Sequence, residues 1–157
     1  MKLSIPLPLQ QEHEALHEEL RRATRAPGEV GEAAKALARL MHPHFVKEDQ
    51  IALPPLGLLA PLARGEVEPG MAEVRALTDR LEAERPQMLE EHKAILVALR
   101  RLQEVAKRDG EAGTVAFAEQ LALHAQTEEE VMYPAALLVG RYLRQVLGNP
   151  TVPGSAS

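Results

Sequence analysis

The sequence predicts an all-α protein that folds as an up-down-up-down bundle of four helices, built from two similar helical hairpins. Apolar residues recur with the period of an amphipathic helix along most of the 157-residue chain. Aromatic residues make up only 3% of the sequence, so the expected core is aliphatic, as in a plain helical bundle. A set of histidine, glutamate and proline residues also appears twice, in the same order, in the two halves of the chain.

Four helices are expected, and proline and glycine residues mark their ends. They span about residues 8–24, 29–53, 71–108 and 111–147. Pro86 is expected to kink or split the third helix, and Pro134 to interrupt the fourth. Between the second and third helices, the apolar and broken stretch Leu53–Leu62 either caps the bundle or offers a dimer surface. Residues 1–147 are expected to form one domain and residues 148–157 a flexible tail.

Composition excludes several classes of function. The chain has no cysteine, which rules out disulfides, iron–sulfur clusters and cysteine-ligated zinc. Its net charge of −5 and the lack of a basic block argue against nucleic-acid binding. No apolar run approaches the length of a transmembrane helix, and the N-terminus does not resemble a signal peptide. We therefore expect a cytoplasmic protein.

Six polar residues fall on the inward faces of the four expected helices, in two sets of matching spacing. The first set is His13, His44 and Glu48, and the second is His92, His124 and Glu128. His92 follows His13 by 79 positions, and the other two pairs are each separated by 80. On the second and fourth helices the flanking apolar residues keep the spacing of an inward seam, from Leu37 to Ile51 and from Phe117 to Val131. All six side chains are therefore expected in the core.

Buried carboxylates need positive charge close by, because burying an unpaired carboxylate is costly or neutralises it. No lysine or arginine lies on these seams, so a metal ion is the expected partner. In each His-x-x-x-Glu motif the two side chains leave the same face of the helix, one turn apart. A single motif of this kind is typical of a surface ion pair. Two in register, each preceded by another seam histidine, favour a two-metal centre of iron, manganese or zinc.

The full pattern is His13, His44-x-x-x-Glu48, His92, His124-x-x-x-Glu128, with Pro54 and Pro134 following the two motifs. It resembles the hemerythrin-like family, also called the HHE cation-binding domain family, over about residues 9–147. The resemblance implies a four-helix bundle around two non-haem iron ions with an oxo or hydroxo bridge, although other divalent metals are compatible. It also implies that His13 and His44 bind one iron, that His92 and His124 bind the other, and that Glu48 and Glu128 bridge them. A ferritin-type site is disfavoured, because that site uses Glu-x-x-His motifs and four carboxylates.

The sequence departs from the oxygen-carrying hemerythrins at one position. Those proteins have a fifth histidine one turn after the third-helix histidine, where this chain has Leu96. His17, one turn after His13, stands at the related place on the first helix. His17 is either a fifth terminal ligand, which would fill one iron and leave the other open, or a residue at the edge of the seam.

The resemblance implies a di-iron protein that binds oxygen or another small diatomic ligand, as a carrier, store or sensor. The alternative is a di-iron protein of nitric oxide or peroxide detoxification, or of iron-centre repair. Repair proteins that the sequence resembles carry a cysteine-bearing domain, and this chain has no cysteine. A third hypothesis is a bundle with a purely structural metal such as zinc.

Other polar residues near the motifs are interpreted as ordinary surface or packing residues. His42 is expected to face solvent, because it lies well round the helix from His44. Glu12, Glu91 and Glu129 each adjoin a candidate ligand; we expect them on the solvated helix surface, and the alternative is that they support a ligand from outside. Tyr133 falls out of phase with the seam, so we interpret it as a packing residue and not as a radical site.

Overall fold

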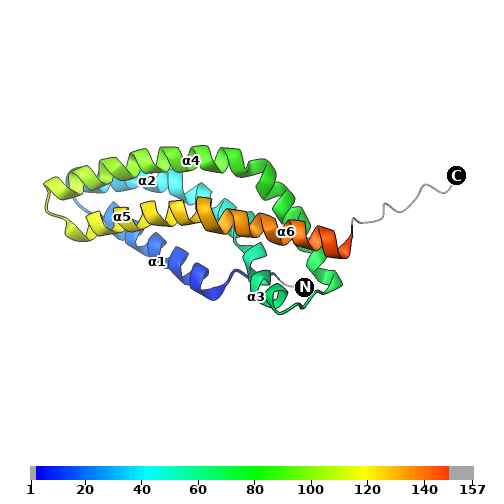
Figure 1. The fold of residues 1–157 in the computed structure, drawn as a ribbon. Helices are drawn as coiled ribbons and strands as arrows, with labels where there is room; N and C mark the ends of the chain where they lie inside the picture. The colour runs from blue at the N-terminus through cyan, green and yellow to red at the C-terminus, as the bar shows by residue number, and fades with distance from the viewer. Residues whose placement is uncertain (1–2, 149–157) are drawn as a thin grey trace.

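The structure, a computed structural model, describes residues 3–148, and the regular elements of that range are all helical. The long segments are α1 (Leu7–Thr24), α2 (Gly28–Lys47), α4 (Val74–Arg108) and the successive pair α5 (Ala112–Thr127) and α6 (Tyr133–Leu147). They run alternately in opposite directions along one long axis (Figure 1). Helix α1 packs against α2 and α5, and α4 packs against α2, α5 and α6. The predicted four-helix bundle of two hairpins is confirmed, while the expected tail lies outside the described residues beyond Gly148.

The connection between the hairpins closes one end of the bundle. It contains the 3-10 turn η2 (Pro54–Leu58), the short helix α3 (Leu59–Ala63) and a second 3-10 turn, η3 (Pro69–Glu73). Leu58 and Met71 from this connection pack with Val139 and Leu143 of α6 in a small apolar cluster. This packing agrees with the expectation that the stretch caps the bundle.

Two π-helical turns interrupt the bundle at matching places, η1 (Glu48–Ala52) after α2 and η4 (Glu128–Met132) after α5. In each turn the N–H five residues on, from Leu53 or Tyr133, donates to the carbonyl of the first glutamate. A π turn inserts one residue into the helix and so rotates every later side chain around the axis. Tyr133 is consequently fully buried, whereas Val131 is 58% exposed. The expectation that Val131 lies on the inward seam is wrong, whereas Ile51 at the matching place in η1 is fully buried.

Pro86 bends the third long helix without splitting it. Helix α4 is continuous over 35 residues with Pro86 inside it, and Figure 1 shows its axis curving in the first half. A proline in a helix removes one backbone hydrogen bond and pushes on the preceding turn, which produces a kink of this kind. The bend lets the first half of α4 follow α6 while the second half follows α2 and α5.

The apolar core is divided along the bundle axis by the candidate ligands. One cluster of buried residues, which includes Leu16 and Ile95, fills the half towards the α1–α2 and α4–α5 loops. A second cluster, which includes Met88 and Tyr133, fills the other half. On α4 the polar residue between the two clusters is His92. Apolar packing on both sides therefore encloses a polar layer in the middle of the molecule.

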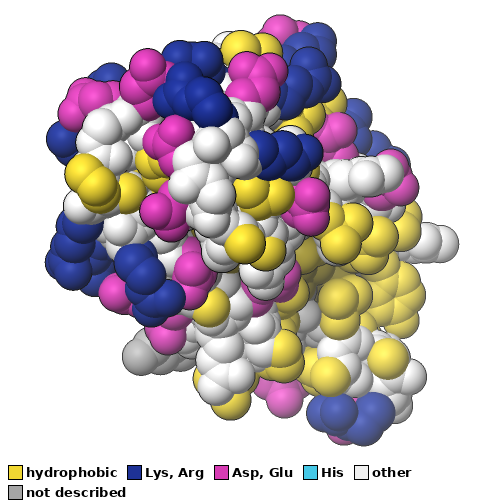
Figure 2. All heavy atoms as spheres, turned by 90° about the vertical axis from the view of Figure 1, so that its left-hand side faces the viewer, with side chains coloured by type: hydrophobic (Ala, Val, Ile, Leu, Met, Phe, Trp, Pro, Cys, Tyr) yellow, Lys and Arg dark blue, Asp and Glu magenta, His cyan; other side chains and the backbone are white. Residues whose placement is uncertain are grey.

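The outer surface carries charges of both signs. Figure 2 shows Lys and Arg side chains interspersed with Asp and Glu on the face that includes the α1–α2 and α4–α5 loops. Within residues 3–148, no helix is both long enough and apolar enough to cross a membrane.

The close approach of α6 to α4 provides a test of this packing. A Cβ added at Gly140 would lie 2.0 Å from Thr78 Oγ1, and Thr78 is itself buried. We expect Gly140→Ala to lower the free energy of unfolding by about 1–3 kcal/mol, because the added methyl overpacks the interface. Adding Thr78→Ala should recover only part of the loss, because it removes Oγ1 and Cγ2 but leaves the Thr78 Cβ 2.6 Å from the added carbon. Urea unfolding curves would measure both effects.

Gly113 offers a matched control, since it lies near the start of α5 with nothing within 4 Å of an added Cβ. Gly113→Ala should be neutral or stabilise by about 0.5–1 kcal/mol. Equal stability of the Gly140→Ala variant and the wild type would contradict the close α4–α6 contact.

Candidate metal centre

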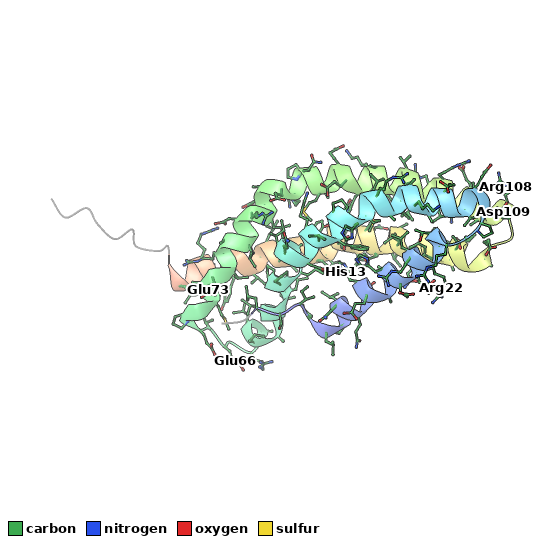
Figure 3. The ribbon with its side chains drawn as sticks, turned by 180° about the vertical axis from the view of Figure 1, so that it is seen from behind. His13, Arg22, Glu66, Glu73, Arg108 and Asp109 are labelled. Carbon is green, nitrogen blue, oxygen red and sulfur yellow. The ribbon has the colours of Figure 1, made fainter. Side chains whose placement is uncertain are left out.

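The six predicted site residues come together in the middle of the bundle and are all buried. Six helical segments supply them, as follows: His13 from α1, His44 from α2, Glu48 from η1, His92 from α4, His124 from α5 and Glu128 from η4. Their relative exposures lie between 0% and 3%. Figure 3 shows His13 midway along the bundle, with its side chain turned in among the helices.

The four histidines form two pairs, and each pair takes one member from each hairpin. Nε2 of His13 lies 3.1 Å from Nε2 of His124. The rings of His44 and His92 lie with their centroids 4.6 Å apart. These contacts differ from the pairing of His13 with His44 that the family resemblance implied. In this bundle α1 borders both α2 and α5, so adjacency of helices alone does not decide which two histidines meet.

The carboxylate of Glu128 lies between the two pairs. Its Oε1 is 2.7 Å from Nε2 of His124 and 3.4 Å from Nε2 of His13. Its Oε2 is 3.2 Å from Nε2 of His92. One oxygen thus faces each histidine pair, which is the arrangement that a bridging carboxylate needs.

The carboxylate of Glu48 spans the centre in the same way. Its Oε1 is 3.0 Å from Nε2 of His44, and its Oε2 is 3.8 Å from Nε2 of His13. The Tyr133 hydroxyl donates a short hydrogen bond to Oε1 and lies 3.3 Å from Nε2 of His92. Tyr133 is buried in the apolar core, as its interpretation as a packing residue expects, but its hydroxyl also reaches the centre. The five-residue repeat of the π turn after Glu128, which the sequence spacing did not reveal, brings this side chain inward.

A ring of four outer carboxylates surrounds the histidines. Each Nδ1 faces one of them: His13 faces Asp49 at 3.2 Å, His44 faces Glu91 at 2.6 Å, His92 faces Glu129 at 2.8 Å and His124 faces Glu12 at 3.1 Å. In every case the acid comes from the neighbouring helical segment. These contacts favour a proton on Nδ1 and so leave Nε2 to face the centre. Of the two alternatives for Glu12, Glu91 and Glu129, support of a candidate ligand is what the structure contains, although each carboxylate remains partly exposed.

The sequence carries a signal for this ring. Glu12 and Glu91 each precede a candidate ligand, and Asp49 and Glu129 each follow one, so all four stand beside ligands at matching positions. Such a neighbour on the same helix points away from the core and towards the adjacent helix, where it meets that helix's histidine. Lys47 also donates to Glu91 at 2.7 Å and holds it against His44.

The carboxylates change the ionisation of the imidazoles. Burial alone would lower the pKa of His92, but the carboxylates of Glu128, Glu48 and Glu129 raise it to about 10. Burial opposes the same shift at His124, where Glu128 and Glu12 raise the pKa to about 9. In Glu128 burial would raise the pKa, but hydrogen bonds from three histidines hold it well below its usual range. The centre therefore contains strong negative charge that attracts cations.

Two observations show that these residues fit a metal. Within residues 3–148, His44 Nε2 and Glu48 Oε2 are buried atoms that have no hydrogen-bond partner, although ordinary packing leaves few such atoms. Two nitrogens bound about 2.1 Å from one ion at a right angle lie about 3 Å apart, and His13 and His124 have this separation. The donors form two groups of atoms lying within 4.8 Å of one another: His44, Glu48, His92 and Glu128; and His13, His124 and Glu128.

The remaining two histidines lie outside both groups. The ring of His17 packs on Phe45, with centroids 4.2 Å apart, and is half-buried. Burial and the charge of His13 lower the pKa of His17, so this imidazole is neutral at neutral pH. His42 is exposed on α2, as expected.

The comparisons with known proteins agree with this geometry. A family model described as the hemerythrin HHE cation binding domain matches residues 8–136, which include all six candidate ligands and Tyr133. No curated protein and no solved structure matches the chain. The match covers most of the chain and the whole polar layer of the bundle, so this protein belongs to the hemerythrin HHE cation-binding domain family.

Proposed function

We propose that this protein holds two iron ions and binds oxygen or another small diatomic ligand, as a carrier, store or sensor in the cytoplasm. The observation that carries the proposal is the pair of buried carboxylates, Glu48 and Glu128, each with one oxygen towards each histidine pair. A pair of iron ions held this way, with an oxo or hydroxo bridge, supplies reversible electron transfer to a small ligand. Nitrogen and oxygen donors without thiolate suit iron among the metals of intermediate hardness.

In this proposal the chain's own residues hold and insulate the centre. His13 and His124 would hold one ion, and His44 and His92 the other. The two carboxylates would bridge the ions, and the outer carboxylates would orient the four imidazoles through Nδ1. The apolar clusters on both sides exclude bulk water, which strengthens each electrostatic contact. The Tyr133 hydroxyl fixes the orientation of the Glu48 carboxylate.

The experiment that tests the function is metal analysis with a near-ultraviolet and visible spectrum of protein from iron-supplied cells, before and after reduction and re-exposure to air. Two iron ions per chain with absorption that returns reversibly with oxygen would support the proposal. Multiple turnover of peroxide or nitric oxide would favour the detoxification alternative, and a colourless zinc protein would overturn the proposal.

The bridging role of Glu128 predicts a loss of metal. Glu128→Gln keeps the shape of the side chain but removes the charge that both histidine pairs face. We expect the content to fall from two ions per chain to one or none, measured by elemental analysis after gel filtration. Glu130→Gln is the control, because Glu130 is exposed and bonds only to Gln126 among the described residues. Full occupancy in the Glu128→Gln variant would sink the bridging assignment.

The ring of outer carboxylates predicts that removing one of them weakens the binding of metal. Glu12→Gln weakens the hold on Nδ1 of His124, and a loss of this kind typically lowers metal affinity about 10–100-fold. Competition with a coloured chelator would measure it. Glu14→Gln, two residues along the same helix, should leave the affinity unchanged, since Glu14 contacts Gln10 and no candidate ligand. If the two variants bind metal equally well, the outer carboxylates do not orient the ligands.

The raised pKa values predict that metal binding expels protons. Before metal binds, the pKa of His92 is about 10 and that of His124 about 9, so both imidazoles are protonated at pH 7. Metal can bind only after these protons leave, so affinity should rise as the pH increases from 7 towards 10. Calorimetric titration with ferrous iron in two buffers of different ionisation enthalpy would count the protons. We expect at least two per chain, and a count of zero would refute the protonated resting state.

A further inference from the structure

One open cavity at the surface borders the candidate metal centre, with His13 in its wall. It has a volume of about 410 Å³ and lies between the segment that precedes α1, helix α1 and the turn η1. Its wall is formed by Leu3, Ser4, Ile5, Gln10, His13, Glu14, His17, Asp49 and Pro54. Among the six candidate ligands, His13 alone belongs to this wall. The cavity therefore reaches the centre on the side that His13 and His124 share.

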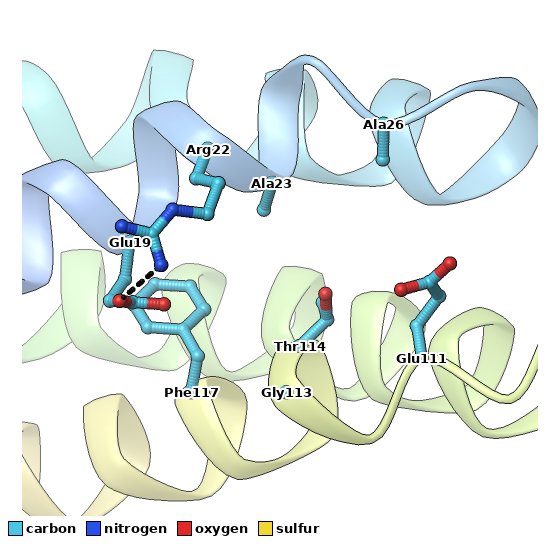
Figure 4. Close-up of a pocket in the computed structure, with 8 residues that line it drawn as sticks. All are labelled: Glu19, Arg22, Ala23, Ala26, Glu111, Gly113, Thr114 and Phe117. Carbon is cyan, nitrogen blue, oxygen red and sulfur yellow. Dashed lines mark hydrogen bonds and ion pairs between the residues drawn. The ribbon is translucent and has the colours of Figure 1, made fainter.

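The cavity is held open on one side by a tight backbone contact. A Cβ added at Gly57 would lie 2.1 Å from the carbonyl oxygen of Ser4, so the segment before α1 rests directly on η2. This contact fixes Ser4 and Ile5 as one wall, while α1 provides the opposite wall. A second cavity, between α1 and α5 near the α1–α2 loop, is drawn in Figure 4 and contains none of the candidate ligands in its wall.

The opposite side of the centre is closed by Tyr133. Its hydroxyl fills the gap between Oε1 of Glu48 and Nε2 of His92, and its side chain is fully buried in the apolar cluster beyond. The residue at the matching place in the first hairpin is Leu53, 80 positions earlier, which has no hydroxyl. The Glu48 carboxylate is accordingly asymmetric: Oε1 accepts from Tyr133, whereas Oε2, towards His13, has no hydrogen-bond partner among the described residues.

The residues one turn after His13 and His92 differ in the same sense. His17 lines the cavity, and its counterpart on α4, 79 positions later, is the apolar and half-buried Leu96. Leu96 packs against the apolar cluster on its side of the centre. The two hairpins thus differ at two places. On the side of His13 the cavity is lined by His17 and Oε2 of Glu48 has no partner, whereas the side of His92 is filled by Tyr133 and Leu96.

We infer that small ligands enter through this cavity and bind on the side held by His13 and His124, while Tyr133 seals the side held by His44 and His92. This inference rests on the proposed function, because it assumes ions at both histidine pairs. The carboxylates of Glu14 and Asp49 at the mouth of the cavity favour an uncharged ligand over an anion. Nitric oxide, a neutral diatomic molecule, is accordingly the appropriate probe.

The test blocks the mouth of the cavity. Gln10 is exposed and lines it, whereas the adjacent Gln11 is exposed on the same helix and does not. In reduced, iron-loaded protein, Gln10→Trp should slow the association of nitric oxide about tenfold, measured by stopped-flow absorption. Gln11→Trp should leave the rate within about twofold of wild type. Thermal melting and iron content, expected to be unchanged in both variants, report on folding.

Equal rates for Gln10→Trp, Gln11→Trp and wild type would overturn the route. A crystal structure of the iron-loaded wild type with nitric oxide gives an independent readout. We expect the ligand beside His13 and His124, and a ligand beside His44 and His92 would overturn the assignment of the open side alone. Failure of nitric oxide to bind the iron-loaded wild type at all would overturn the proposed function together with the route.

Discussion

The structure depends on placing two carboxylates, Glu48 and Glu128, in the interior of a small helical bundle. A buried carboxylate that loses its partner costs about 3–5 kcal/mol, so positive charge must accompany both groups. The four imidazoles provide it, either as protonated rings or as ligands that bring in metal cations. Protons and metal ions both supply the positive charge that the two buried carboxylates require. The same negative centre therefore holds the four helices around it and favours the binding of cations.

The outer carboxylates form similar contacts with the imidazoles nearer the helix surface. Each of the four acids reaches from one helical segment to the histidine of its neighbour, so the contacts run in a closed circuit around the bundle. A helix that rotated about its axis would break two of these contacts, one that its acid makes and one that its histidine makes. The circuit therefore fixes the rotation of the helices more tightly than aliphatic side chains alone would do, since Leu and Ala tolerate small shifts in packing.

Much of the fold and the residues of the polar layer could be predicted because they follow from regular spacing. His44 and Glu48 are four residues apart, and their burial follows from the apolar residues before them. The prediction fails where the helix leaves that period. The π turn after Glu128 brings Tyr133 inward, and no local residue preference announces such a turn. The pairing of His13 with His124 also depends on how four helices close around a centre, which a linear pattern does not contain.

The pairing across hairpins has a consequence for how the protein is assembled. Each histidine pair joins one residue of the first hairpin to one of the second, so neither half of the chain possesses a complete site. An ion held by such a pair would cross-link the two halves of the chain. The two halves also repeat the same arrangement of donors. One hairpin bound to a copy of itself would bring together four histidines, two inner glutamates and four outer carboxylates, whereas a tyrosine at the place of Tyr133 occurs in the second hairpin and a leucine, Leu53, in the first.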